Sequence, residues 1–286
     1  MTVHVVGSIN LDTIVRVAVF PAPGETVLGS AARRVIGGKG ANQALAATAA
    51  GARTTFTGAV GDDEAGRDAL AQLRGAGIDI GGVRTTDAAT GIALIAVDPS
   101  GENTIIVASG ANALVDPSWC DRLALEAGDV VLVQGEVPVA AIDAAAAAAA
   151  LGGARFVLNL APPVEVSATT LAVCDPLVVN EHEASALGIA VDSAGGRVRS
   201  LVITLGAAGS AYADAQGKGT LPAAPAEVVD TIGAGDAFTG ALAAALAGGA
   251  GLPAAVEAGA AYAAEIIGAV GANALAGSAL ISGSAS

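Results

Sequence analysis

Short apolar runs alternate with alanine-rich runs along most of this chain, and this alternation restricts the folds that it can adopt. The apolar runs are continuous, as in strands of a parallel sheet that is covered on both faces. The alanine-rich runs have the composition of helices, since alanine is the best helix former. The pattern predicts an α/β fold with a doubly wound, mainly parallel sheet. We expect strands over 3–7, 54–60, 130–134, 156–160, 177–179 and 201–205, and helices over 40–50, 65–76, 139–151 and 235–246.

Two segments interrupt this alternation, because each holds strand-like runs with no helix between them. One contains the sequence PAPGET and the other contains DPSGEN, and both are rich in residues that favour turns. Each segment predicts a hairpin, and the two hairpins together predict a separate small β-sheet, placed as a lid over a site. We expect the lid at 13–35 and 91–109, and the large α/β domain at 1–12, 36–90 and 110–286.

The composition excludes several classes of protein. With 286 residues, 53% of them hydrophobic, the chain can bury a large core without disulfides or structural metals. Its two cysteines, Cys120 and Cys174, are far apart and accompanied only by His4 and His182, which makes a zinc site or a Cys–His catalytic pair improbable. Thirteen Lys and Arg against 27 Asp and Glu give a net charge of −14, which argues against a nucleic-acid partner.

One stretch without charges, residues 237–256, is long enough to span a membrane. It consists mostly of alanine and glycine and contains Pro253, whereas membrane spans are dominated by larger apolar residues. We therefore expect a buried helix followed by a turn. The start of the chain, MTVHVVGSIN, lacks the basic region of a secretory leader, so we expect a cytoplasmic protein with no membrane partner.

The segment Asp230–Asp236, with the sequence DTIGAGD, carries the strongest chemical signal and precedes the helical run AFTGALAAAL. Glycines just before a helix leave backbone N–H groups exposed, and with the helix dipole these groups bind anions. Asp236 would lie beside a bound phosphate, where a carboxylate can take a proton from an attacking hydroxyl. Alternatively, Asp236 is only a favourable first-turn residue of a helix. The candidate anion site consists of Gly233, Ala234 and Gly235.

A second glycine-rich segment, GGKGANQ at 37–43, precedes the first predicted helix. It is not a Walker A loop, because Gly40 rather than Ser or Thr follows Lys39 and the leading glycine is missing. Its glycines would let a ligand approach the backbone, and Lys39 and Asn42, three residues apart at a helix start, would point toward that ligand together. The alternative is a flexible turn that caps the helix.

Polar residues follow several of the predicted strands. Asn10 and Asp12 come after the first strand and would share one face of an extended segment, at the end of the sheet where α/β proteins bind ligands. Asn180 and Glu183 follow a later strand and could hold Mg²⁺ through water. Glu136, after the strand VVLVQ, belongs to the same class. A turn cap, or ordinary exposure to solvent, is the alternative for each of these residues.

Taken together and in this order, GGKGANQ, NEHE at 180–183 and DTIGAGD resemble the ribokinase-like (PfkB) family of sugar kinases. The opening GSINLDTIV with FPAPGETV, the lid-like GIALIAVDPSGENTIIVASGAN, and VITLGAAGS also resemble segments of that family, from about residue 3 to about residue 273. The resemblance implies a Rossmann-like α/β domain with a small β-sheet lid that also forms a homodimer interface.

The resemblance also implies roles for individual residues. Asp236 would be the catalytic base for the terminal hydroxyl of the sugar, with Gly233, Ala234 and Gly235 as the anion hole. The sugar hydroxyls would be held by Asn10, Asp12, Gly38, Lys39, Asn42, Glu136 and Asp236. The nucleotide would contact Asn180, Thr204, Gly206, Gly209 and Gly235, and Glu183 would organise Mg²⁺.

The resemblance also implies a site for an activating monovalent cation such as K⁺, formed by the carbonyls of Asp230, Ile232, Ile266, Ala269 and Gly271. After Gly271 the chain reads Ala-Asn-Ala-Leu where the family has Ala-Gln-Pro-Ser, and we expect weaker activation by the cation.

These expectations combine into an ATP-dependent kinase that phosphorylates the terminal hydroxyl of a pentose, with D-ribose and ribose 5-phosphate as the first choice. A related kinase for deoxyribose, a nucleoside or fructose is an alternative, although four Phe, two Tyr and one Trp leave little for stacking on a base. A non-catalytic sugar-binding protein is disfavoured by Asp236 in an intact glycine-rich turn. A dinucleotide-binding oxidoreductase is disfavoured because no G-x-G-x-x-G follows the first strand.

Overall fold

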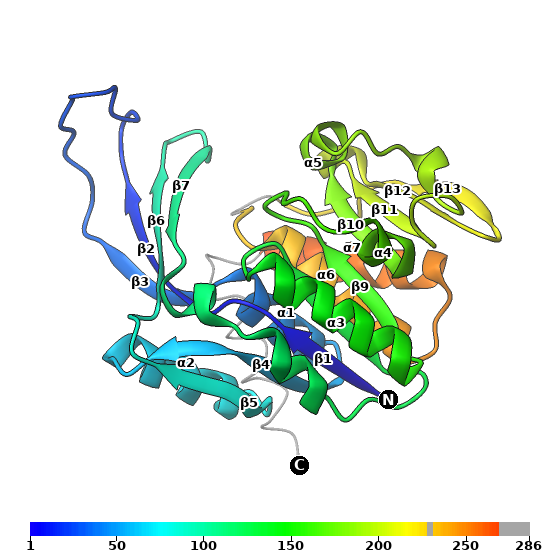
Figure 1. Cartoon of the computed structure of the whole chain (residues 1–286). Helices are drawn as coiled ribbons and strands as arrows, with labels where there is room; N and C mark the ends of the chain where they lie inside the picture. Colours follow the sequence, from blue (N-terminus) through cyan, green and yellow to red (C-terminus); the bar gives the residue numbers. More distant parts are fainter. Residues whose placement is uncertain (228–230, 269–286) are drawn as a thin grey trace, which may run out of the picture.

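The computed structural model describes residues 1–227 and 231–268 of the chain (Figure 1). Within these residues, nine strands form one large sheet in the order β13-β12-β11-β10-β9-β8-β1-β4-β5. Neighbouring strands from β5 to β11 are parallel, and β12 and β13 continue the sheet as an antiparallel hairpin. The strands are β1 (Thr2–Val6), β4 (Arg53–Gly61), β5 (Asp79–Thr86), β8 (Val130–Gln134), β9 (Arg155–Asn159), β10 (Cys174–Asn180), β11 (Leu201–Thr204), β12 (Ser210–Asp214) and β13 (Gly217–Leu221).

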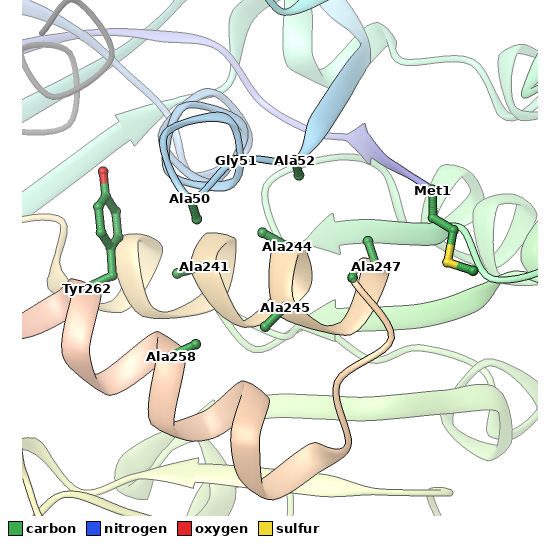
Figure 2. Close-up of a pocket in the computed structure, with 11 residues that line it drawn as sticks. Met1, Ala50, Gly51, Ala52, Ala241, Ala244, Ala245, Ala247, Ala258 and Tyr262 are labelled. Carbon is green, nitrogen blue, oxygen red and sulfur yellow. The ribbon is translucent and has the colours of Figure 1, made fainter. Parts of the chain in front are cut away.

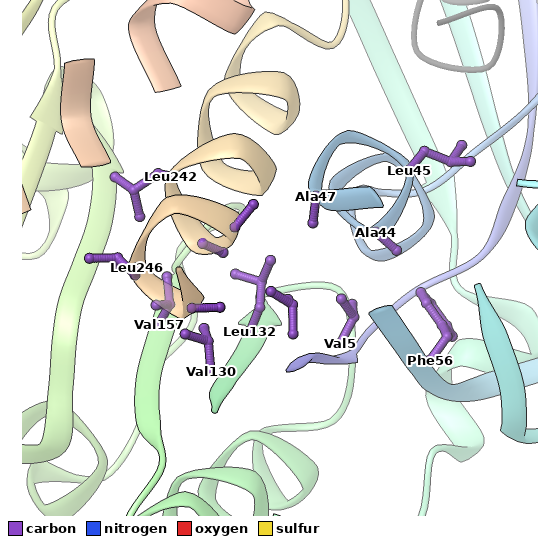
Figure 3. Packing of buried hydrophobic residues seen from close by; sticks show 14 of the residues in the cluster. Val5, Ala44, Leu45, Ala47, Phe56, Val130, Leu132, Val157, Leu242 and Leu246 are labelled. Carbon is purple, nitrogen blue, oxygen red and sulfur yellow. The ribbon is translucent and has the colours of Figure 1, made fainter. Parts of the chain in front are cut away.

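Helices cover both faces of this sheet, because alternate side chains of a strand point to opposite sides. Val130 and Leu132 of β8 belong to a core shared with α1 and α6, whereas Val131 and Val133 belong to a second core shared with α3. Figure 3 shows the first core, with Leu242 of α6 beside the sheet. The helices are α1 (Lys39–Ala49), α2 (Glu64–Gly75), α3 (Val139–Gly152), α4 (Ala168–Val173), α5 (Glu181–Ala186), α6 (Ala234–Ala247) and α7 (Leu252–Ile267).

A second sheet of four strands stands apart from the large one and is called the lid below (Figure 1). Its order is β3-β2-β6-β7, with antiparallel pairs β2–β3 and β6–β7 and a parallel pair β2–β6. Ala93, Ile95 and Val97 of β6 are buried on its inner face, whereas every residue of β7 is exposed. The lid strands are β2 (Asn10–Arg16), β3 (Arg33–Gly37), β6 (Gly91–Val97) and β7 (Asn103–Ala108).

The helices that border the site begin at glycines with a positive φ. Gly38, at the start of α1, has a φ of 89°, and Gly233, at the start of α6, has a φ of 81°. L-residues with a side chain rarely adopt this conformation, so both turns depend on glycine. The two glycine-rich motifs therefore serve to start two helices at the same end of the sheet.

The predicted fold class is confirmed. All the predicted strands and helices are present, with boundaries within three residues of the predicted ones, and the two predicted hairpins pair into one small sheet. The stretch 237–256 forms most of α6, a turn and the start of α7, and no helix in the described part of the chain is long and apolar enough to cross a membrane. Strands β5, β12 and β13 and helices α4, α5 and α7 were not predicted.

Candidate active site

A cavity of about 200 Å³ lies where the lid, the start of α1 and the start of α6 meet. Parallel α/β sheets bind ligands at this end, beyond the carboxyl ends of their strands. Each residue predicted to hold the sugar lies in the cavity wall, together with residues from the inner face of the lid. The lining residues are Asn10, Asp12, Gly38, Lys39, Asn42, Ala93, Ile95, Asn103, Ile105, Val107, Glu136, Thr231, Ile232, Gly233 and Asp236.

Asp236 lies in the first turn of α6 and is 7% exposed. Asn42 Nδ2 donates a hydrogen bond to its Oδ2 at 3.1 Å, and Gln43 Nε2 donates to its Oδ1 at 2.9 Å. Both donors come from α1, so the contact between two helices fixes the direction of both carboxylate oxygens. A carboxylate held in this way at the cavity edge can accept a proton from a hydroxyl bound there.

Among the described residues that line this cavity, Lys39 has the one cationic side chain. The negative charge of Asp236 holds the pKa of Lys39 above its usual range; burial opposes this effect, and Glu136, Glu183 and Asp12 add to it. Lys39 is therefore protonated at neutral pH. Its charge balances part of the negative charge that the carboxylates place around the cavity.

Asp12 is 9% exposed, and its surroundings disfavour the ionised form of its carboxyl group. Burial, followed by the negative charges of Glu136 and Asp236, raises its pKa to about 7, although Lys39 partly offsets this. Its Oδ1 is buried and has no hydrogen-bond partner within the described residues. Since buried polar atoms are nearly always paired, a hydroxyl of a bound sugar would supply the missing hydrogen bond.

Glu136 follows β8 and is joined to the start of α1. Its Oε2 accepts hydrogen bonds from Ser8 Oγ at 2.5 Å and from the backbone N–H of Lys39 at 3.0 Å. Ser8 Oγ in turn accepts from the backbone N–H of Gly40 at 3.2 Å. The carboxylate thus satisfies backbone donors at the helix start, which hold it in place beside the cavity.

Asn10 is oriented by a second asparagine. Its Oδ1 accepts from Asn112 Nδ2 at 2.8 Å, and Asn112 also bonds the backbone N–H and carbonyl of Ile9, at 2.9 Å and 3.0 Å. Asn112 lies in a 3₁₀ turn, η1 (Gly110–Leu114), that follows the lid strand β7. Its amide therefore fixes the segment between β1 and β2, from which Asn10 and Asp12 reach the cavity.

The predicted anion hole forms the turn into α6. Within it, the N–H of Ala234 donates to the carbonyl of Thr231 at 3.3 Å. The next N–H groups, those of Gly235 and Asp236, belong to the first turn of α6, where no intrahelical acceptor exists. Gly235 and Asp236 are thus the better placed of these donors for a phosphate, together with the positive end of the α6 dipole.

Apart from Gly235 in the first turn of α6, the residues predicted for the nucleotide lie at or just beyond the ends of β10 and β11, and all of them lie outside the lining of the cavity described above. Asn180 and Thr204 are direct neighbours in the parallel pairing of these strands. Asn180 and Glu183 form a capping box at the start of α5: each side chain accepts from the backbone N–H of the other at 2.8 Å. Gly206 and Gly209 form the turn η4 and its end, with φ values of 55° and 97°.

The structure addresses only part of the predicted cation site. Ile232 lies against the lid core formed by Ala93, Ile95 and Val97, and Ile266 is buried near the end of α7. The remaining predicted ligands lie outside the described residues: Asp230, Ala269 and Gly271, together with Leu275 in the departure from the family sequence.

Sequence reasoning missed several buried polar residues around the site. Gln43 and Ser8 stand inside two of the motifs, GGKGANQ and GSIN, but the motifs alone predict no role for them. Gln134 and Asn159 each end an apolar strand, VVLVQ and RFVLN, and a polar residue in such a position is a readable signal. Asn112 carries no signal, because its role depends on packing against a segment about one hundred residues earlier.

A larger cavity of about 490 Å³ lies elsewhere, between the end of α1, α6 and α7 (Figure 2). Its walls are mostly alanine, with Met1 and Tyr262, and none of its described lining residues is Asp, Glu, Lys, Arg or His. Such a wall offers neither a base nor ligands for a phosphate. This cavity is therefore a poorer candidate for an active site than the cavity beneath the lid, where the motif residues meet.

Comparison with known proteins identifies the family of this chain. The pfkB family of carbohydrate kinases matches residues 2–277, so the chain belongs to this family. It is 38% identical over 255 residues to a bifunctional ribokinase/ribose-5-phosphate isomerase A of Fructilactobacillus sanfranciscensis, covering 84% of this chain and 47%, about half, of that protein. It is 32% identical over 274 residues to the ribokinase of Schizosaccharomyces pombe, covering 87% of this chain and 86% of the relative. The structure of Arabidopsis thaliana ribokinase complexed with ribose and ATP superimposes with a TM-score of 0.81 at 29% identity, covering 100% of this chain and 99% of that one. The resemblance seen in the motifs is thus confirmed.

Proposed function

We propose that this protein is an ATP-dependent sugar kinase that converts D-ribose to ribose 5-phosphate. The observation that carries the proposal is the position of Asp236: its carboxylate borders a cavity of polar side chains and lies in the first turn of a helix that follows a glycine turn. The names of the relatives, and the ribose and ATP with which the Arabidopsis ribokinase is complexed, support this substrate pair. Because ATP is the phosphoryl donor, we place the activity in the cytoplasm.

The cavity suits a small polyhydroxylated ligand. Asp12 and Glu136 offer acceptors, while Lys39 and Asn42 offer donors, so sugar hydroxyls find both kinds of partner. No Phe, Tyr or Trp is among the described residues of the cavity wall, so a nucleoside base would have no ring there on which to stack. These features favour a free pentose over a nucleoside.

The reaction uses the chain mainly for positioning and charge stabilisation. The terminal hydroxyl of the sugar gives its proton to Asp236 as its oxygen bonds to the γ-phosphorus of ATP, and the bond from that phosphorus to ADP breaks. The first N–H groups of α6 and the Lys39 ammonium stabilise the negative charge on the transferred group. Closure of the lid over the cavity would exclude water, so that ATP is not hydrolysed in place of the sugar reaction.

The proposed reaction also involves two cations, Mg²⁺ and a monovalent cation. Glu183 uses Oε2 for the capping box, and its Oε1 faces no hydrogen-bond partner among the described residues, so a hydrated Mg²⁺ could bind there with Asn180 nearby. This ion would neutralise charge on the ATP phosphates. A monovalent cation such as K⁺ would bind near the carbonyls of Ile232 and Ile266, and we expect its effect on the rate to be small.

The outer face of the lid supports a homodimer. Leu94 of β6 and Ile106 of β7 are direct neighbours in the sheet and are 51% and 64% exposed, with Ile92 beside them at 37%. A contiguous apolar face of this kind on a sheet calls for a cover. We propose that the lid of a second copy covers it.

An ADP-release assay over ribose, 2-deoxyribose, fructose and nucleosides tests the function. We expect the highest kcat/KM with ribose, and a kcat lower by about 100-fold or more in the variant Asp236→Asn. Highest kcat/KM with a nucleoside or fructose would contradict the proposed substrate, and sugar binding without any ADP release by the wild-type protein would indicate a non-catalytic sugar-binding protein.

A further inference from the structure

Three buried amide side chains connect Asp236 to the ends of two central strands. Gln43 Nε2 donates to Asp236 Oδ1 at 2.9 Å and to Asn159 Oδ1 at 2.8 Å. Gln43 Oε1 accepts from Gln134 Nε2 at 2.8 Å. Gln134 ends β8 and Asn159 ends β9, so the sheet itself holds the far end of this hydrogen-bonded chain.

The direction of every amide in this chain is determined by groups that can only accept. The Asp236 carboxylate accepts, so Gln43 must turn its NH₂ group toward it. The carbonyl of Val178 also accepts, from Asn159 Nδ2 at 3.1 Å, which leaves the oxygen of Asn159 for Gln43. The oxygen of Gln43 then remains for Gln134, which donates to it. The acceptors thus determine the orientations of Asn159 and Gln43, and Gln134 donates to the remaining oxygen of Gln43, while its own Oε1 is buried and has no hydrogen-bond partner in the described part of the chain.

Gln43 is placed to act on Asp236 and not on substrate. Gln43 and Gln134 are both 0% exposed, and neither lines the cavity, whereas the neighbouring Asn42 does. The backbone around Gln43 is also confined, because a Cβ at Gly240 of α6 would lie 2.5 Å from its carbonyl oxygen. This close contact of α1 with α6 leaves the Gln43 side chain little room for another position.

We propose that Gln43, held by its bonds to Asn159 and Gln134, is a positioning residue for the base. Its amide holds Asp236 Oδ1 on the buried side, so that Oδ2, next to Asn42 at the cavity, is the oxygen that faces the sugar. Each oxygen accepts one N–H, but Oδ1 is turned away from the cavity, so the proton of the sugar hydroxyl is received on the second lone pair of Oδ2. The inference rests on the proposed role of Asp236 as the base.

The variant Gln43→Met tests this role, because methionine has a similar length and no amide donor. If the base moves by about an ångström away from the sugar hydroxyl, the rate of the reaction falls by about 10- to 100-fold. We therefore expect kcat to fall by about this factor, while the KM values for ribose and ATP stay within about twofold, since Gln43 touches neither. A residue that served only the packing of α1 would not produce this split between kcat and KM.

Two further variants separate positioning from general damage. Gln134→Met keeps the hydrogen bond from Gln43 Nε2 to Asp236 and removes only the bond that Gln134 donates to Gln43 Oε1. The Gln43 amide then rotates more freely, so we expect a smaller fall in kcat, about 3- to 10-fold. Thr170→Val removes another buried hydrogen bond to a carboxylate, from Thr170 Oγ1 to Asp143 Oδ1 at 2.5 Å, far from the site. This control should lower the melting temperature and leave kcat unchanged.

A double-mutant cycle with Asp236→Asn completes the test. If Gln43 acts through the carboxylate, Gln43→Met should change the residual kcat of Asp236→Asn by less than about twofold. A folded Gln43→Met protein with normal kcat overturns the positioning role, as does an equal loss in both backgrounds. If Gln43→Met does not fold, a normal kcat in Gln134→Met overturns it. Normal kcat in Asp236→Asn would instead refute the proposed base, a result distinct from these.

Discussion

The proposed sugar half and the proposed nucleotide half of the candidate site are held in place by different kinds of hydrogen bond. In the sugar half, Asn42 and Gln43 bond to Asp236 across separations of 194 and 193 residues. In the nucleotide half, Asn180 and Glu183 bond to each other across three residues, at an exposed helix start. The long-range bonds exist only when the whole domain is folded, whereas a capping box needs only one helix turn.

The two halves should therefore respond differently to amino-acid substitutions. The proposed base and the residues proposed to hold the sugar are buried or half-buried and share partners, so one substitution alters several neighbours and their effects do not add. The nucleotide residues are exposed and local, so substitutions there should act on ATP binding and on little else. Substitutions in the two halves therefore test this contrast directly.

The largest effect is expected at the residue where the long-range bonds converge. Asp236→Asn keeps the shape of the side chain and removes its ability to take a proton, so kcat should fall about 100-fold or more. Ribose and ATP should still bind, because the other ligands of both remain. Steady-state rates and calorimetric titrations with each ligand measure the two properties separately.

Near-normal turnover of Asp236→Asn would show that another group accepts the proton. A suitable control is Asp121→Asn, which changes an exposed acid at the end of the 3₁₀ turn η2 (Pro117–Arg122). Its kcat should equal that of the unchanged protein.

The fold could be predicted where the sequence pattern is local. The strand VVLVQ is an uninterrupted apolar run, and Gly38 and Gly233 mark helix starts by their need for positive φ. The strands that escaped prediction lack such a pattern: β5 reads DIGGVRTT at one edge of the sheet, and β13 reads GKGTL at the other. Edge strands are partly exposed, and their pairing rather than their composition forms them.

The candidate site divides in the same way. Asn10, Lys39 and Asp236 stand in motifs, so their chemistry was visible, and the structure brings them to one cavity. The roles of the partners that hold them were not predicted: Gln134 has a readable position at the end of an apolar strand, but what it and Asn112 hold depends on residues about one hundred positions away. Sequence patterns identified the groups for the chemistry, and the fold supplies those that orient them.

A smaller effect, confined to the sugar, is expected at Asn42. Loss of a hydrogen-bonding side chain from a closed site costs about 1–3 kcal/mol. Asn42→Ala should therefore raise the KM for ribose several-fold or more and leave the KM for ATP nearly unchanged. Steady-state assays with each substrate varied in turn measure both. A defect confined to ATP would reverse the assignment of the two halves.

The pH dependence of protein stability should reveal the raised pKa of Asp12. The pKa of Asp12 is about 7 in the folded protein, against 3.8 for the ordinary group. Between these values the folded protein holds a proton that the unfolded chain has released, so this residue makes the free energy of unfolding fall as pH rises from about 4 to 7. Asp12→Asn removes this contribution, which is at most about 4 kcal/mol for a pKa raised from 3.8 to about 7. The fall in melting temperature between pH 4 and pH 8 without sugar should therefore be smaller in the variant by several degrees, since each kcal/mol shifts it by about 2–4 °C. Equal falls in both proteins would show that Asp12 is ionised throughout.

The smallest effect is expected in the nucleotide half, at Asn180. Asn180→Ala removes the side-chain half of the capping box, and loss of a cap costs about 1 kcal/mol of local helix stability. Because α5 is short and exposed at this end, the damage should stay at the nucleotide and raise the KM for ATP only a few-fold. The KM for ribose should not change, since no bond joins Asn180 to the sugar cavity in the described part of the chain. Glu181→Ala, next to it on the same exposed turn, serves as the control and should leave both KM values unchanged. A loss of ribose affinity in Asn180→Ala would mean that the two halves are coupled, and that the contrast between a locally held and a globally held half does not describe this site.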